Sequence, residues 1–388
     1  MPSAALKRRL AALSTPMLAL VFRASRRRRL DLADPREAAQ VKTVLAVRLD
    51  AIGDLLLTEP ALGALRSRFP NARLDLIASP ASVAVLEGNP AIDRLIPYWA
   101  PWHEAWRGAK IDWRTEATRL WRLTASLRRE RYDAGFELRG DPRDIALLAA
   151  SLPRALVGSG IRGGGALLDI DVPLDYWSGH QVENAVSIVS AGLPERLQVR
   201  RPQLVLPESA RVRAEKLLPS GDAVIGLHLG AGFPSKQLPI EKFAAVVRAL
   251  CCRHPDLRFA VVGAGDESGL AHDLEEQAGM PVLDLTGQLS LLETAAAIER
   301  MRLFIGNDSA PIHLAASVGT PVVTFFGPSE PWKFHPYGVS HRLLYLGLEC
   351  SPCDYVHCVW AEGQKYQCMV RQDTDAIVQA AEELLARS

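Results

Sequence analysis

The sequence predicts an α/β fold with two domains, each built on a parallel sheet that helices cover on both faces. At 388 residues the chain is longer than one ordinary domain. Short apolar runs alternate with helical stretches along most of it, which is typical of strands buried on both faces of a parallel sheet. The alternation occurs twice and loosens in between, so two similar halves are expected.

The first series of elements begins near residue 42. Its expected strands are 44–47, 73–78, 94–98, 134–138 and 155–158, and its expected helices are 61–69, 80–88, 114–129 and 144–151. A tryptophan-rich insert at 99–106 is expected to form a surface loop, with rings that either stack on a sugar or pack under the loop.

The pattern loosens past residue 171, resumes in a helix at 180–191 and breaks again at 200–207. The strands of the second series are expected at 223–229, 258–263, 281–285, 303–305 and 321–326. We therefore expect a basic apolar segment (1–40), a first domain (41–200), a linker (201–222) and a second domain (223–388). A cleft between two such domains is a preferred ligand site.

The net charge of +1 conceals a strongly basic N-terminus. Residues 1–30 carry eight Lys and Arg and no acid, which leaves 37 basic against 44 acidic residues in the remainder. The apolar run 10–22 is too short to cross a bilayer, and a poor secretory cleavage site follows it. We expect an interfacial helix on an anionic membrane, with a solvated tail as the alternative. Nucleic-acid binding is disfavoured because interleaved aromatic residues and a basic groove motif are lacking.

The first motif spans residues 44–60. It combines a buried strand, a tight turn containing Gly53, and a helix that is expected from residue 55. Asp54 therefore falls at the carboxyl end of a strand, where open α/β sheets bind ligands. From this stretch alone, Asp54 is equally well interpreted as a helix cap or as a catalytic base.

Two further motifs lie in the second series. Residues 228–236 contain glycines that let backbone amides approach an anion, and Lys236 adds a positive charge. Residues 305–321 contain a strand and then a helix that begins near Ser309, and such a helix N-terminus favours a phosphate group. Asp308 can cap that helix or accept a sugar hydroxyl. His313 lies one turn into it, and on the local pattern alone it is an ordinary core histidine.

Together these motifs resemble glycosyltransferase family 9, the ADP-heptose:lipopolysaccharide heptosyltransferases and their relatives. The matching segments are 48–54 with 57–60, Lys236 with Pro239, Thr286 with Gly287, and 308–309 with His313. They follow one another in the family's order from about residue 42 to the C-terminus.

The resemblance implies the GT-B architecture, in which the parallel sheets of two Rossmann-like domains face a central cleft. It places the acceptor on the first domain, with Asp54 as the general base, and the nucleotide sugar on the second. It implies that Lys236 and the segment with Asp308, Ser309, Ala310 and His313 bind the donor diphosphate. The other residues expected on the donor side are Thr286 and Gly287, Gly230 of the 228–236 motif, and Glu267, which ends a glycine turn at 262–267 that is either a phosphate turn or a plain turn. The residues expected on the acceptor side are Arg48, Gly53, Arg139 and Asp141.

Two positions depart from the family pattern and bear on the identity of the donor. Ala310 occupies the third position of an Asp-Ser-Gly pattern, although its backbone amide is still available for phosphate. Leu238 replaces a tryptophan that often precedes the proline. Residues 139–141 and 163–168 resemble segments of less studied family members, whose acceptors vary.

No metal is expected at the diphosphate. The acidic pair Asp169 and Asp171 has the spacing of metal-dependent transferases, but it reads as an ordinary strand end and the resemblance implies metal independence. Four cysteines, Cys350, Cys353, Cys358 and Cys368, are close enough in sequence for a structural zinc ion, although the spacing lacks a second C-x2-C pair. Disulfides are not expected in a reducing cytosol.

The sequence therefore predicts an inverting, metal-independent glycosyltransferase that needs no cofactor. Its expected donor is a nucleotide sugar, most simply ADP-heptose, and its acceptor a lipopolysaccharide core or another lipid-linked glycan. It is expected on the cytoplasmic face of the inner membrane. Two alternatives remain: a nucleotide-sugar epimerase of the same architecture, which would turn over the donor alone, and a non-catalytic nucleotide-sugar-binding protein at the membrane.

Overall fold

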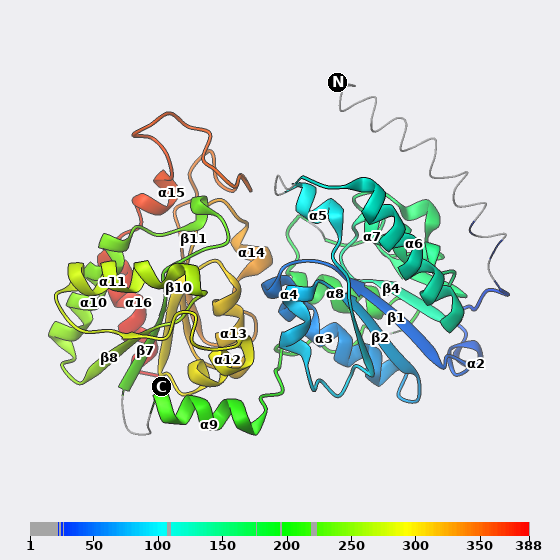
Figure 1. Ribbon diagram of the computed structural model, residues 1–388, viewed down its shortest axis with the longest axis horizontal. Helices are drawn as coiled ribbons and strands as arrows, with labels where there is room; N and C mark the ends of the chain where they lie inside the picture. The colour runs from blue at the N-terminus through cyan, green and yellow to red at the C-terminus, as the bar shows by residue number, and fades with distance from the viewer. Residues whose placement is uncertain are drawn as a thin grey trace. The chain divides into compact units, whose positions relative to one another are not determined.

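A computed structural model of the protein describes residues 22, 25, 27–106, 110–175, 177–194, 196–218 and 223–387. The chain divides into two compact units, Met1–Val199 and Arg200–Ser388, each with its own sheet (Figure 1). We call them the N-terminal and the C-terminal unit. The interfacial helix expected at 10–22 lies, except for Phe22, outside the described residues.

The N-terminal unit contains six parallel strands in the order β3-β2-β1-β4-β5-β6. They are β1 (Thr43–Arg48), β2 (Arg73–Ala78), β3 (Arg94–Pro97), β4 (Ala134–Glu137), β5 (Ala155–Gly158) and β6 (Ile170–Asp171). Val44 pairs with Leu74 on one side and with Ala134 on the other, so β1 lies inside the sheet. Its side chains from Val44 to Arg48 are buried, as expected for a strand covered on both faces.

Helices cover both faces of this sheet. They are α2 (Pro35–Ala38), α3 (Ile52–Arg68), α4 (Pro80–Val83), η1 (Ala84–Leu86), α5 (Pro101–Trp106), α6 (Trp113–Glu130), α7 (Pro142–Ala150), η2 (Gly165–Leu167) and α8 (Gln181–Val189). Leu45 and Val47 of β1 pack with residues of α6 and α7 in one core cluster. On the other side α3 packs along α8, and Phe136 of β4 contacts Phe69 at the end of α3.

The C-terminal unit has a second parallel sheet in the order β12-β11-β10-β7-β8-β9. Its strands are β7 (Ala223–His228), β8 (Leu257–Val261), β9 (Leu283–Asp284), β10 (Leu303–Asn307), β11 (Val322–Phe326) and β12 (His341–Tyr345). The remaining elements are α9 (Glu208–Leu217), η3 (Pro234–Lys236), α10 (Ile240–Arg253), η4 (Gly265–Glu267), α11 (Ser268–Ala278), α12 (Leu291–Glu299), α13 (Ala310–Val318), α14 (Pro331–Phe334), α15 (Gln367–Val370) and α16 (Thr374–Leu385).

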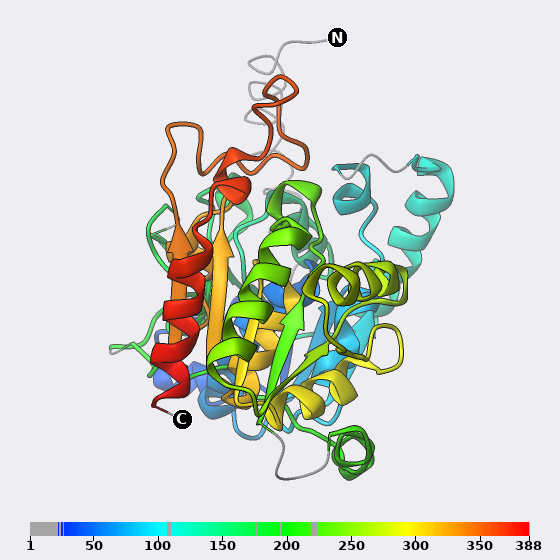
Figure 2. The ribbon, with the colours of Figure 1, turned by 90° about the vertical axis from the view of Figure 1, so that its left-hand side faces the viewer.

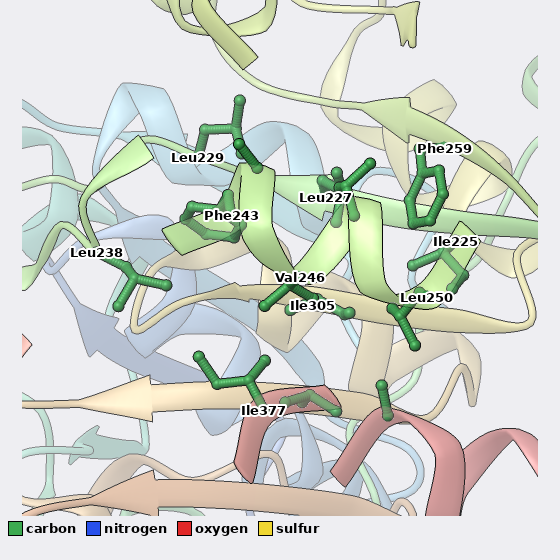
Figure 3. Close-up of a cluster of buried hydrophobic side chains, with 14 of the residues drawn as sticks. Ile225, Leu227, Leu229, Leu238, Phe243, Val246, Leu250, Phe259, Ile305 and Ile377 are labelled. Carbon is green, nitrogen blue, oxygen red and sulfur yellow. The ribbon is translucent and has the colours of Figure 1, made fainter. Parts of the chain in front are cut away.

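The core of the C-terminal unit forms where the central strands meet α10 and α16 (Figures 2 and 3). Ile225 and Leu227 of β7 alternate with residues that point to the other face, and they pack against Phe243 and Leu250 of α10. Ile377 of α16 closes the same cluster. This packing fixes the loops that leave the carboxyl ends of β7 and β10.

The α/β class with two parallel sheets is confirmed, while several local expectations differ from the structure. The stretch 201–222, expected to be a linker, contains helix α9, whose buried Ala210 and Ala214 face α12. The tryptophan-rich insert is not a plain loop, because it contains the short helix α5. Helix α3 begins at Ile52, earlier than expected, which places Pro60 inside the helix. Strands β6 and β12 were not expected from the apolar pattern, because none of their residues is fully buried.

Candidate functional site

Each sheet has one topological switch point, and the candidate residues gather at both. In the N-terminal unit the strand order runs outward from β1 on one side and from β4 on the other. In the C-terminal unit the order runs outward from β7 and from β10 in the same way. Ligands of open α/β sheets bind beyond the carboxyl ends of the strands at such points.

In the N-terminal unit, the loop after β1 carries Asp54 in the first turn of α3. Ala51 is the N-cap residue and makes no side-chain capping bond, so the helix-cap interpretation of Asp54 does not fit. The Asp54 side chain is 29% exposed, and its Oδ1 lies 3.6 Å from Nη2 of Arg48. Gly53 lies buried beside it in the same turn. A carboxylate therefore faces outward at the end of the central strand, next to a buried cation.

Arg48 is almost completely buried, and a carbonyl oxygen and a carboxylate hold its guanidinium in place. Its Nη1 donates a hydrogen bond of 2.9 Å to the carbonyl oxygen of Leu138, and its Nε lies 2.9 Å from Oδ2 of Asp50. Arg139, from the loop after β4, donates to the other oxygen of Asp50. Burial alone would raise the pKa of Asp50, but Arg139 and Arg48 outweigh burial and hold that pKa below its usual value.

The insert between β3 and α6 supplies His103 to the same cluster. Its Nε2 lies 3.6 Å from Oδ2 of Asp144 and 3.9 Å from Oδ1 of Asp50. Trp102 donates a hydrogen bond of 2.9 Å from Nε1 to the other oxygen of Asp144. Burial raises the pKa of Asp144. The insert is thus anchored to α7 through one buried carboxylate.

Glu137, at the end of β4, is a buried acid next to this cluster. Burial raises its pKa to about 8, and the neighbouring Asp144 adds to the effect. Its carboxyl oxygens accept hydrogen bonds from the backbone amides of Arg139, Gly140 and Asp141. Glu137 therefore shapes the loop on which Arg139 lies.

Asp141 has a structural place in that loop. It is the N-cap of α7, where its Oδ1 accepts from the amide of Arg143 at 2.9 Å, and the Arg143 guanidinium binds both of its oxygens. The carboxylate is fully buried. Burial opposes the charge, but the Arg143 contacts lower the pKa of Asp141 well below its usual value.

In the C-terminal unit, Lys236 and Asp308 meet at the switch point between β7 and β10. The Lys236 Nζ lies 2.7 Å from Oδ2 of Asp308, and the Ser329 hydroxyl donates to the same oxygen. Burial would raise the pKa of Asp308, but Lys236 and Ser329 lower it below its usual value. The Lys236 side chain keeps 21% of its surface exposed, so its ammonium is held in place but still open to solvent.

Asn307 ties the two loops together, although the sequence reading did not single it out. Its Nδ2 donates to the carbonyl oxygens of Leu229 and Gly230, at 3.0 and 2.9 Å. Its Oδ1 accepts from the amide of Leu238 at 3.0 Å. Leu238 is buried in the core, so the side chain at this departure from the family pattern has a packing role.

Two glycines form a cradle for the carboxylate of Glu267. A Cβ added at Gly230 would come 1.6 Å from its Oε1, and one added at Gly263 would come 2.3 Å from its Oε2. His228 Nε2 lies 3.4 Å from Oε2, and the Ala264 amide donates to that oxygen at 2.8 Å. Burial works against ionisation, but His228 and the Ala264 amide lower the pKa of Glu267.

Thr286 and Gly287 form the turn after β9, beside this cradle. The Thr286 hydroxyl donates to Oδ1 of Asp284 at 2.6 Å. Gly287 has φ +66°, and a Cβ there would come 2.6 Å from the Cα of Gly265. Only a glycine tolerates both the left-handed backbone and the close approach of the neighbouring loop.

The N-terminus of α13 lies directly after Asp308. Ser309 is the N-cap and makes no side-chain capping bond, so the amide of Ala310 heads the helix without an acceptor inside it. His313 is buried, and its Nδ1 has no hydrogen-bond partner among the described residues. Burial lowers the pKa of His313 to about 4, so the imidazole is neutral near pH 7.

The chain matches a known family. The sequence model of glycosyltransferase family 9 (heptosyltransferase) matches residues 120–362, which is more than half of the chain. The chain belongs to glycosyltransferase family 9. It is 27% identical over 307 residues to lipopolysaccharide heptosyltransferase 3 of Escherichia coli, an alignment that covers 76% of this chain and 86% of the relative.

Solved structures confirm the GT-B fold of this glycosyltransferase. The family 9 glycosyltransferase from Veillonella parvula superposes with a TM-score of 0.75 at 22% identity, over 90% of this chain and 99% of that one. The E. coli ADP-heptose LPS heptosyltransferase II superposes with a TM-score of 0.68 at 20% identity, over 89% and 99% of the two chains.

Asp169 and Asp171, the acidic pair with the spacing of a metal site, accept hydrogen bonds from nearby backbone amides in this glycosyltransferase. Asp169 Oδ2 accepts from the amide of Leu156 at 2.9 Å, and Asp171 Oδ1 accepts from the amide of Gly160 at 2.6 Å. Within the described ranges, the one group of three possible ligand side chains within 4.8 Å of one another is Asp50, His103 and Asp144. Two arginines already bind Asp50 there, so this group is an ion-pair network in the structure.

The four clustered cysteines, Cys350, Cys353, Cys358 and Cys368, line one pocket of about 480 Å³ in the C-terminal unit. Tyr355, Trp360 and Tyr366 line it with them. Burial raises the pKa of Cys368 to about 11, and the neighbouring cysteines add to the effect, so its thiol is protonated near neutral pH. The pocket adjoins the loop that carries Lys236, because the Ser235 hydroxyl donates to the Tyr355 carbonyl oxygen at 2.5 Å.

The sequence did not lead us to Asp50, His103, Glu137 and Asp144 in the N-terminal unit. Asp50 lies inside the first motif, and Glu137 ends a strand next to Arg139. Ligands of open α/β sheets bind beyond the carboxyl ends of the strands, so this rule could have indicated both residues. His103 and Asp144 come together only through the packing of α5 on α7, which no local pattern indicates.

Proposed function

We propose that this glycosyltransferase moves a heptose from ADP-heptose to a lipopolysaccharide core or another lipid-linked glycan, with inversion at the anomeric carbon and without a metal. The observation that carries the proposal is that each unit holds one half of such a reaction at its switch point. A partly exposed carboxylate, Asp54, lies in the first turn of α3 after β1, and a positioned ammonium, Lys236, lies beside Asp308 at the N-terminus of the helix after β10. The donor named for the solved E. coli relative supports ADP-heptose.

Asp54 is assigned as the general base. It takes the proton of the acceptor hydroxyl while that oxygen attacks the anomeric carbon of the donor. The bond from that carbon to the diphosphate breaks on the opposite side, so ADP leaves and the configuration inverts. Arg48, 3.6 Å away, favours the ionised form of Asp54 before the proton arrives.

Lys236 and the amide of Ala310 are assigned to the leaving diphosphate. Charge on that group grows as the bond breaks, and a fixed ammonium and a helix N-terminus stabilise it without rearranging. Asp308 holds the ammonium in position, as its 2.7 Å contact indicates. His313 lies one turn into the same helix. Because its pKa is lowered to about 4, it is neutral at pH 7, and the positive charge at the diphosphate comes from Lys236.

Glu267 is assigned to the hydroxyls of the nucleotide ribose. Its lowered pKa keeps it ionised at neutral pH, so it can accept hydrogen bonds from a diol. Gly230 and Gly263 leave the space that its carboxylate occupies, and Thr286 with Gly287 forms the neighbouring wall.

Arg139 is assigned to the acceptor. It extends from the loop after β4 onto Asp50, and 27% of its side chain is exposed to solvent. A guanidinium there suits the phosphates or carboxylates of a lipid-linked glycan. Asp141 and Gly53 support this side indirectly, since Asp141 caps α7 and Gly53 lies in the first turn of α3.

We further propose that the enzyme works at the cytoplasmic face of the inner membrane, with the basic segment 1–30 contributing to attachment. The positive charge of residues 1–30 supports attachment to an anionic membrane. A lipid-linked acceptor would also require the enzyme to work at the membrane surface. No helix in the described part of the chain is long and apolar enough to span a bilayer.

The test is an ADP-release assay with ADP-heptose, with and without a lipopolysaccharide-core acceptor, in the presence and absence of EDTA. We expect release only with the acceptor, no effect of EDTA, and a product whose anomeric configuration by NMR is opposite to that of the donor. Epimerised ADP-heptose without acceptor would establish the epimerase alternative. Donor binding without turnover, over a panel of glycan acceptors, would establish a binding protein. Loss of activity in EDTA that Mg²⁺ restores would overturn the metal-free mechanism.

A further inference from the structure

The outer side of α6 exposes tryptophan and arginine side chains that no described residue covers. Trp121, in the middle of the helix, is 69% exposed. Large aromatic surfaces in contact with water are uncommon, and together with a polar rim they mark sites of interaction. Figures 1 and 2 place α6 at the periphery of its unit.

The helix separates an apolar inner side from a cationic outer side. Leu120, Leu123 and Leu127 pack into the core of the N-terminal unit. At about 100° per residue, Trp121 and three arginines fall in a sector roughly 100° wide on the outer side. Those arginines are Arg114, Arg122 and Arg129, all exposed. Trp121 and these three arginines are called the α6 outer face.

The charge of the α6 outer face is not neutralised from within. Arg114, Arg122 and Arg129 form no ion pair with any described residue. The two acids of the helix lie elsewhere: Glu116 pairs with Arg119 at 2.8 Å, and Glu130 pairs with Arg73 and Arg94 of the sheet. The outer side is therefore positive in net charge and carries one large apolar side chain, Trp121.

We propose that the α6 outer face is a docking surface for an anionic lipid bilayer. Indole rings favour the boundary between headgroups and acyl chains, and guanidinium groups bind lipid phosphates. A helix that combines the two along one side can lie in the plane of the interface. Protein interfaces also enrich tryptophan and arginine. We choose the bilayer because this face carries three cations and no acid, as an anionic surface requires.

The described part of the N-terminus continues this surface. Arg27 donates to the carbonyl oxygen of Tyr132 at 3.2 Å and to that of Arg131, just past the end of α6. The basic segment thus leaves the folded unit next to α6. The inference does not depend on the donor, the acceptor or the role of Asp54, because it is tested by binding and not by turnover.

The test is co-sedimentation of the full-length protein with vesicles of phosphatidylglycerol and phosphatidylcholine, and with phosphatidylcholine alone. Arg114→Gln/Arg122→Gln/Arg129→Gln should weaken binding to the anionic vesicles by about a hundredfold, since each cation at such a surface contributes about fivefold. The matched control removes three cations from α9, with Arg211→Gln/Arg213→Gln/Lys216→Gln, and should bind as the wild type does. Equal weakening by both triple variants would overturn the proposal, because the attraction would then depend only on net charge.

A second measurement decides the matter even where residues 1–30 dominate the affinity. Lipids brominated along the acyl chain quench only the tryptophans that enter the bilayer. Trp121→Phe should lose a share of the quenching that the wild type shows on anionic vesicles, whereas Trp177→Phe, at an equally exposed site, should not. Identical quenching in the wild type and in Trp121→Phe would place α6 away from the lipid and overturn the proposal. Thermal melting of each variant checks that the exposed substitutions leave the fold intact.

Discussion

Replacing Lys236 by methionine should weaken the binding of ADP by about tenfold to 150-fold. The Lys236 ammonium lies 2.7 Å from Asp308 at the head of α13, and it is the cation that we assign to the diphosphate. A charge-assisted hydrogen bond contributes about 1.5–3 kcal/mol, and each 1.4 kcal/mol corresponds to about a factor of ten in Kd. Methionine keeps the length and the apolar stem of the side chain but lacks the charge.

The same substitution disturbs Asp308, so the experiment needs a second variant. In the wild type Lys236 lowers the pKa of Asp308, and this pair contributes stability above the carboxyl's unfolded pKa that is lost as the pH falls through the lowered value. Without Lys236, burial raises that pKa, and the variant loses stability as the pH rises. Lys236→Met/Asp308→Asn removes the isolated charge and should recover much of the melting temperature without recovering ADP affinity.

Isothermal titration with ADP measures the effect. Lys242→Met is the control, because the Lys242 ammonium donates to the carbonyl oxygen of Gln372 at 2.7 Å and makes no contact with Asp308. Its ADP affinity should equal that of the wild type. If Lys236→Met/Asp308→Asn folds and binds ADP within about threefold of the wild type, then Lys236 does not bind the diphosphate and the reasoning fails.

Three further substitutions test neighbouring parts of the account. Gly230→Ala should weaken ADP binding about tenfold or more, because the new Cβ would displace the Glu267 carboxylate. Gly232→Ala is the control for the same titration. Its new Cβ would have no atom within 4 Å, so it should bind ADP as the wild type does. Glu137→Gln should flatten the loss of stability that the wild type shows in melting curves as the pH rises from 4.5 to about 8, since the folded state keeps a proton there that the unfolded state releases. His313→Gln should flatten the loss of stability that the wild type shows as the pH falls from 6.5 to about 4, because the unfolded histidine binds a proton in this range and the buried one does not. If either variant keeps the wild-type dependence of stability on pH, another group is responsible for it.

The architecture could be predicted from the sequence because strands of a parallel sheet are buried on both faces. Runs such as 44–47 and 223–229 are therefore apolar throughout and stand out in the sequence. Strand β12 did not stand out in the sequence, because each of its five residues is partly exposed in the structure. Helix α9 buries only Ala210 and Ala214, and two alanines in a highly charged segment give too weak an apolar stripe to separate a helix from a linker.

The site in the C-terminal unit could be predicted further than the site in the N-terminal unit. Asp308 directly follows β10, Lys236 lies on the loop after β7, and these two strands lie side by side at the switch point. On the acceptor side, local sequence pointed to Asp54, Arg48 and Arg139. It did not show that Arg48 and Arg139 share Asp50, because that contact depends on the packing of loops 89 residues apart. Such long-range charge pairs follow from the fold and not from any spacing in the sequence.

The most direct test of the central claim is the transfer rate of Asp54→Asn, measured with ADP-heptose and a lipopolysaccharide-core acceptor, beside its affinity for ADP. The amide keeps the shape of a side chain that is 29% exposed, so the variant should fold and bind ADP as the wild type does. Because it cannot accept the acceptor's proton, its rate should fall by about a hundredfold to ten-thousandfold. A transfer rate within a few fold of the wild type would contradict the assignment of Asp54 as the base and, with it, the mechanism proposed for this enzyme.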